Sequence, residues 1–117
     1  MFRCFVTSIL FVLSANVSSA DIATHSGKIT QIGAFPHNYG TYNENEKGRL
    51  TIYIDGIPPG CESGLPRVVI GVDHPIYDSV LSIALMAKAS QTEVTVTYFK
   101  ECTIRGNSWD LANLVIE

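Results

Sequence analysis

Short stretches of alternating apolar and polar residues run along the chain and predict β-strands. In RLTIYIDG (49–56), Leu50, Ile52 and Ile54 recur at every second position, with polar or amphipathic residues between them. This period of two places the apolar side chains on one face of a half-buried strand. EVTVTYFKEC (93–102) alternates in the same way, so it is a second predicted strand of this kind.

Three further segments complete the predicted strands. SGKITQIGAF (26–35) is rich in β-branched residues, RVVIGV (67–72) is apolar throughout, and LANLVIE (111–117) closes the chain. A continuous apolar run favours a strand that is covered on both faces. The segments PHNYGTYNENEKG (36–48) and IPPGCESGLP (57–66) are rich in glycine, proline or asparagine, which predicts loops.

One segment, 76–90, has helical periodicity. Asp73 suits the N-cap position and Pro75 suits the first turn, where a missing N–H costs nothing. At about 100° per residue, the apolar side chains cover an arc of roughly 200°. This arc holds Ile76, Tyr77, Val80, Leu81, Ile83, Ala84, Leu85 and Ala87. The opposite arc holds Asp78, Ser79, Ser82, Met86, Ala89 and Ser90. We expect the wide apolar face to be buried in the fold.

The predicted order is therefore β-β-β-α-β-β, which is mainly β with one helix. Five strands with a helix between the third and the fourth indicate a small OB-fold-like barrel, with the helix closing one end. The alternative is an α+β fold, a curved antiparallel sheet with one packed helix. Periodicity does not separate the two architectures.

The first twenty residues have the layout of a signal peptide. Arg3 precedes an apolar run and the small residues Ser18 and Ala20 stand at the predicted cut. The apolar run, residues 4–13, is about half the ~20 residues that a membrane span needs. We expect cleavage after Ala20, a single domain over 21–117 without a membrane span, and a periplasmic or secreted location.

Two cysteines remain after this cleavage, Cys61 and Cys102, which are 41 residues apart. In an exported chain an even pair predicts one disulfide, because the export compartment is oxidising. Two buried free thiols are the alternative.

The segment LSIALMAKASQTEVTVTYFKEC resembles small exported bacterial proteins of uncharacterised function. Their pattern combines an L..AKA helix, a V-x-V-x-Y strand and a cysteine just after it. The matching positions are Leu85, Ala87, Lys88, Ala89, Val94, Val96, Tyr98 and Cys102. The architecture also looks like the pentameric sugar-binding B subunits of bacterial AB-type toxins, which implies a binding role. No sugar-pocket motif carries over to individual residues.

Charge and residue spacing argue against several functions. Residues 21–117 carry seven basic and eleven acidic side chains, a net charge of −4, without a basic cluster, so nucleic acid is a poor partner. His25, His37 and His74 stand singly, without the short spacing of metal ligands. No motif joins a nucleophile to a base, so we expect no enzyme and no cofactor.

The suggestive residues are aromatic and polar: Tyr39, Tyr42, Asn43, Tyr53 and Trp109. Such groups suit recognition of a glycan or protein ligand, although ordinary packing is the stronger interpretation, because aromatic residues are common in strands and loops. We expect an exported non-catalytic binding module, with carbohydrate as the candidate ligand. The alternative is a structural or assembly protein of the bacterial envelope. The serine-rich back of helix 76–90 fits either a homo-oligomer contact or a solvated face.

Overall fold

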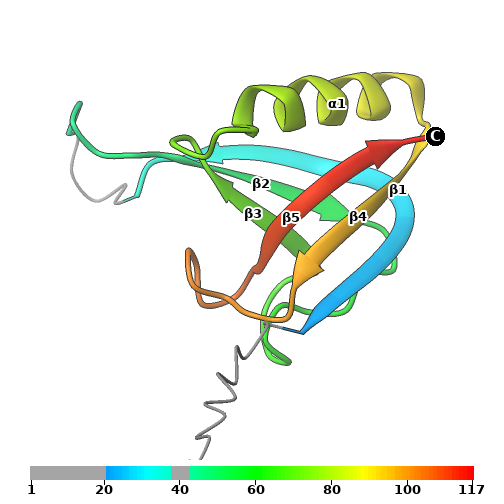
Figure 1. Ribbon diagram of the computed structural model, residues 1–117, viewed down its shortest axis with the longest axis horizontal. Coiled ribbons are helices and arrows are strands. Elements are labelled where there is room, and N and C mark those ends of the chain that lie inside the picture. Colours follow the sequence, from blue (N-terminus) through cyan, green and yellow to red (C-terminus); the bar gives the residue numbers. More distant parts are fainter. Residues whose placement is uncertain (1–20, 38–42) are drawn as a thin grey trace, which may run out of the picture.

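The computed structural model describes residues 21–37 and 43–117, which form a mainly β structure with one helix (Figure 1). The elements are β1 (Ile22–Phe35), β2 (Arg49–Ile54), β3 (Arg67–Gly71), α1 (Tyr77–Ser90), β4 (Glu93–Phe99) and β5 (Trp109–Ile116). The predicted order β-β-β-α-β-β is confirmed. The predicted signal peptide, residues 1–20, lies outside the described residues.

The five strands form a mixed sheet that closes in a ring, in the order β1-β2-β3-β5-β4. The ring closes because β1 pairs with β2 on one side and with β4 on the other. The pair of β3 and β5 is parallel, and the other neighbouring pairs are antiparallel. The alternative of a wholly antiparallel curved sheet therefore does not describe this protein.

Strand β1 serves both neighbours by bending. Its residues 22–28 pair with β4, and residues from Ile29 onward pair with β2, with an irregularity between Ile29 and Gln31. Such a bulge bends a strand and increases its twist, which helps a short sheet to close. β1 begins four residues earlier than predicted, because the segment 22–25 is held as a strand by its pairing with β4.

The core lies inside the ring, where the predicted alternation is confirmed. Leu50, Ile52 and Ile54 of β2 point into it and are buried, as are the alternating residues of β4. β3 is buried on both faces, as its apolar run predicts. Thr51, on the outer face of β2, is also buried, so side chains from outside the ring cover this part of the sheet.

Strand β5 begins at Trp109, two residues before the start of the predicted closing strand at Leu111. The register to β4 shifts between Tyr98 and Thr97, which face Leu111 and Asn113 respectively. This irregularity changes the phase of the alternation, so that Leu111 and Leu114 are both buried. The inward-facing positions of β5 therefore do not follow one period of two along the sequence.

Helix α1 packs against β1 and β5 (Figure 1) and buries Val80, Ala84 and Ala87. The predicted apolar arc is too wide, because Leu85 is 54 % exposed. The residue at the N-cap is Ile76, without a capping side chain, so the prediction of Asp73 as N-cap is wrong.

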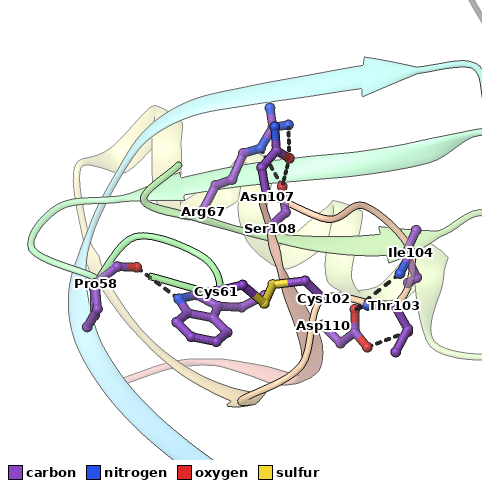
Figure 2. Close-up of a disulfide and its surroundings, with 10 residues drawn as sticks. Pro58, Cys61, Arg67, Cys102, Thr103, Ile104, Asn107, Ser108 and Asp110 are labelled. Carbon is purple, nitrogen blue, oxygen red and sulfur yellow. Dashed lines mark hydrogen bonds between the residues drawn. A yellow bond between two sulfur atoms is a disulfide. The ribbon is translucent and has the colours of Figure 1, made fainter. Parts of the chain in front are cut away.

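The predicted disulfide is present between Cys61 and Cys102 (Figure 2). It joins the β2–β3 loop, residues 55–66, to the β4–β5 loop, residues 100–108. The bond is consistent with an extracytoplasmic location, where disulfides persist. Within residues 21–37 and 43–117, no helix combines the length and apolar character needed to cross a membrane.

Replacing both cysteines, Cys61→Ala with Cys102→Ala, should lower the free energy of unfolding by about 4 kcal/mol, because the unfolded chain regains the entropy that the closed loop removes. Fluorescence of Trp109, the single tryptophan of the chain, reports unfolding in urea. Wild-type protein treated with dithiothreitol is the control and should unfold at the same urea concentration as the double variant. A double variant as stable as the oxidised protein would contradict this role of the bond.

Tyr98 should make the stability of the fold depend on alkaline pH. Burial raises the pKa of its phenol above the ordinary value of 10.0, because the phenolate is desolvated. Its contribution to stability is therefore complete below about pH 10 and is lost as the pH rises through the raised pKa. The variant Tyr98→Phe should show a flatter alkaline profile in urea unfolding. Parallel profiles of wild type and variant would assign the effect to another group.

Candidate functional site

The structure separates the residues predicted to form a binding surface. Tyr39 and Tyr42 lie outside the described residues. Asn43 is exposed in the segment that precedes β2 in the chain, and its side-chain oxygen accepts a hydrogen bond from the Asn45 N–H at 3.0 Å. Tyr53 lies half-buried on the outer face of β2. The described members therefore do not form one exposed aromatic surface.

Trp109 does not belong to such a surface, because it is part of the hydrophobic core. It is 8 % exposed, and its ring centroid lies 5.3 Å from that of Tyr98. Its Nε1 donates a hydrogen bond of 2.8 Å to the Pro58 carbonyl oxygen, which ties β5 to the β2–β3 loop. The alternative interpretation of Trp109 as a packing residue fits these contacts.

Tyr53 is instead the partner of an arginine on the neighbouring strand. Tyr53 and Arg67 are paired in the register of β2 and β3. The Arg67 guanidinium carbon lies 5.3 Å from the centroid of the Tyr53 ring, and its Nη1 donates to the Tyr53 hydroxyl at 3.1 Å. A guanidinium over an aromatic face is held by cation–π attraction as well as by the hydrogen bond. Tyr53 therefore fixes the position of a positive charge.

Arg67 is held in place on its remaining edge by the β4–β5 loop. Its Nε donates to the Ser108 hydroxyl at 2.7 Å, and its Nη2 donates to the Asn107 side-chain oxygen at 3.2 Å. Figure 2 shows these two residues beside Arg67. The Ser108 hydroxyl donates in turn to the same Asn107 oxygen at 3.0 Å. Arg67 is only 7 % exposed, so a formal charge is buried here among neutral partners.

A depression of about 220 Å³ opens next to this network. Its lining consists of Phe35, Arg49, Leu65, Arg67, Arg105 and Asn107, and we call it the arginine pocket. All three arginines of residues 21–117 line it. Among these described lining residues there is no aspartate or glutamate. The pocket therefore concentrates positive charge in a chain that is acidic as a whole.

A second depression, of about 370 Å³, adjoins the first and shares Arg49 with it. His37 and His74 line it, together with Lys47 and Asp73, whose Nζ and carboxylate oxygen are 3.1 Å apart. The hydrogen bond from Lys47 is the largest cause of a lowered pKa of the Asp73 carboxyl, and a backbone hydrogen bond is the second largest. Over residues 21–37 and 43–117, no group of three histidine, cysteine or acidic side chains is arranged to hold a metal ion.

The arginine pocket depends on close contact between the two loops that the disulfide joins. The Leu65 N–H donates to the Asn107 carbonyl oxygen at 2.9 Å. A side chain at Gly60 would place its Cβ 2.7 Å from that same oxygen, and one at Gly64 would also collide with Asn107. Only glycine allows the two backbones to approach in this way. The contact thereby brings Arg105 and Asn107 close to Arg49 of β2 and Arg67 of β3, and these four residues line the pocket together.

Asp110 shapes the loop that carries Arg105. Its carboxylate accepts hydrogen bonds from the Thr103 N–H at 3.0 Å, from the Thr103 hydroxyl at 2.5 Å and from the Ile104 N–H at 3.4 Å (Figure 2). A carboxylate that accepts backbone N–H groups stabilises a turn. Asp110 therefore holds the start of the loop.

The sequence interpretation missed the pocket because its arginines are far apart in the chain. Arg49, Arg67 and Arg105 belong to β2, β3 and the β4–β5 loop, and no motif connects them. The one available signal was that they are the only arginines of residues 21–117.

No protein-family model matches this chain, and no curated protein matches it significantly. The resemblance to small exported bacterial proteins, carried by the helix and the strand that follows it, therefore stays a prediction. The geometry of the described residues is what supports a function.

Proposed function

We propose that this protein is an exported, non-catalytic binding module built on an OB-fold-like barrel. The closed ring of five strands and the helix between β3 and β4 support this architecture, since the OB-fold is a five-stranded Greek-key barrel. The disulfide supports a periplasmic or secreted location.

The observation that carries the binding role is the arginine pocket on the outer face of β2 and β3. Tyr53 and Arg67 project from this face, because their neighbours Ile52 and Val68 point into the core. Guanidinium and amide groups are held there by hydrogen bonds before any ligand arrives, which lowers the entropic cost of binding. OB-folds bind oligosaccharides and oligonucleotides through the corresponding strands.

A binding role also fits the chemistry of the pocket better than catalysis. Catalysis by a nucleophile needs a hydroxyl, thiol or amine beside a general base. The pocket is lined by arginine, asparagine, phenylalanine and leucine side chains, which act as fixed donors and apolar contacts. A glycan is the ligand that we propose, because the aromatic ring of Phe35 and the polar side chains of Arg105 and Asn107, which line the pocket, suit its hydroxyl-rich surface.

A glycan array probed with the refolded domain, residues 21–117, tests this function. We expect reproducible binding to a subset of related glycans by the oxidised protein. The reduced and alkylated protein is the control, and it should lose these signals because its two loops are no longer tethered. An array without reproducible signals above this control would contradict a glycan-binding role.

The second candidate is a structural or assembly protein of the bacterial envelope, which forms a homo-oligomer through α1. The outer face of α1 favours it, because Leu85 is 54 % and Met86 62 % exposed beside small residues. The Ser82 hydroxyl donates to the Asp78 carbonyl oxygen, and the Ser90 hydroxyl donates to the Met86 carbonyl oxygen. Both hydroxyl donors are therefore satisfied within the helix. Exposed apolar side chains of this size are typical of contact surfaces.

Light scattering at micromolar concentration tests this assembly. We expect a mass of several chains for the wild type and of one chain for Ser82→Glu, because a charge in a packed interface is costly. The matched control, Asn113→Glu, adds the same charge at an exposed position of β5 and should leave the mass unchanged. A wild-type mass of one chain would rule out assembly through α1 under these conditions.

A further inference from the structure

We propose that the arginine pocket is an oxyanion site, which binds a sulfate, phosphate or carboxylate group of an acidic ligand. This deepens the binding function and rests on it for the identity of the larger ligand, a glycan. The anion site itself follows from the charges, the burial and the geometry of the pocket.

Three like charges converge on the arginine pocket. Arg49, Arg67 and Arg105 come from three different segments of a chain with seven basic and eleven acidic residues over 21–117. Positive charges that line one depression repel one another, and the repulsion is stronger where water is partly excluded. An anion in the pocket would turn this repulsion into attraction.

The buried guanidinium of Arg67 has only neutral hydrogen-bond partners. A buried arginine is normally paired with a carboxylate, because an uncompensated buried charge is costly. The three hydrogen bonds of the Arg67 guanidinium go to the hydroxyls of Ser108 and Tyr53 and to the amide oxygen of Asn107, all of them neutral. A guanidinium carries five N–H donors, so donors remain beyond these three bonds. The partners fix the plane of the group and leave its charge available.

The size and lining of the arginine pocket also suit an oxyanion. Its volume of about 220 Å³ is below the ~300–1,000 Å³ of sites that enclose a whole small molecule. It therefore suits one charged group of a larger ligand. Planar guanidinium groups bind the oxygens of carboxylates, sulfates and phosphates with paired hydrogen bonds. Phe35 and Leu65 provide apolar contacts for the part of the ligand that follows the anion.

A nucleic acid is the less favoured source of the oxyanion. Binding of a phosphate backbone requires basic side chains along an extended track. Here the arginines line a single depression instead of a track. The lysine that lines the adjoining depression, Lys47, is paired with Asp73. An acidic glycan presents its charged group singly and fits this arrangement better.

Titration of the folded domain with inorganic sulfate tests the anion site, with affinity and chemical shifts followed by NMR. Chloride at the same ionic strength is the reference. We expect saturable binding of sulfate, with shifts centred on the arginine pocket. Arg105→Gln should weaken this binding about tenfold, the value of one charge-assisted hydrogen bond.

The matched control is Lys100→Gln, which removes the same charge at the exposed first position of the loop and should leave the affinity unchanged. Arg105 makes none of the hydrogen bonds that hold Arg67, so its replacement should leave the fold intact. Sulfate binding no stronger than chloride binding would overturn the proposal, as would equal weakening by both variants.

A pair of disaccharides, one sulfated and its unsulfated counterpart, separates the two proposals. Preference of the wild type for the sulfated sugar, lost in Arg105→Gln, supports both. Binding of free sulfate without either sugar supports the anion site and contradicts the glycan. Equal binding of both sugars that does not depend on Arg105 supports the glycan and contradicts the anion site. Tighter, Arg105-dependent binding of a short DNA duplex would assign the oxyanion to a nucleic acid.

Discussion

The contact between the β2–β3 loop and the β4–β5 loop determines the structure of one end of this protein. The disulfide of Cys61 and Cys102 joins the loops covalently, and the Leu65 N–H bonds the Asn107 carbonyl oxygen between them. Parallel strands cannot be joined by a tight turn, so β3 and β5 come together through segments distant in sequence. The loop contact stabilises this junction. It also places Asn107 beside the first residue of β3, Arg67, whose guanidinium donates a hydrogen bond to the Asn107 side-chain oxygen.

Most of the fold could be predicted because its strands alternate regularly. β2 and β4 have one face in the core, and their apolar residues therefore recur at every second position. The start of β5 was missed because the irregularity beside Asn113 changes the phase of the alternation. The true start of α1 at Tyr77 lacks a capping side chain, so the capping rule selected Asp73, which pairs with Lys47 instead.

The candidate site was harder to predict, because it is created by tertiary contacts. Tyr53 and Trp109 were chosen for their chemistry, but composition does not show that one stacks on Arg67 and the other packs in the core. The arginines meet through the register of β2 with β3 and through the position of the β4–β5 loop. Neither relation leaves a periodic or local signal around Arg49 or Arg105.

The disulfide between the two loops also makes this end of the molecule sensitive to redox conditions. A disulfide forms in an oxidising compartment, and the cytosol keeps thiols reduced. Under reducing conditions the bond between Cys61 and Cys102 is absent, and non-covalent contacts such as the hydrogen bond from the Leu65 N–H to the Asn107 carbonyl oxygen are left to hold the two loops together. The covalent tether between the two loops, and with it the stability of this end of the molecule, therefore depends on the redox state of the surroundings in which the chain folds.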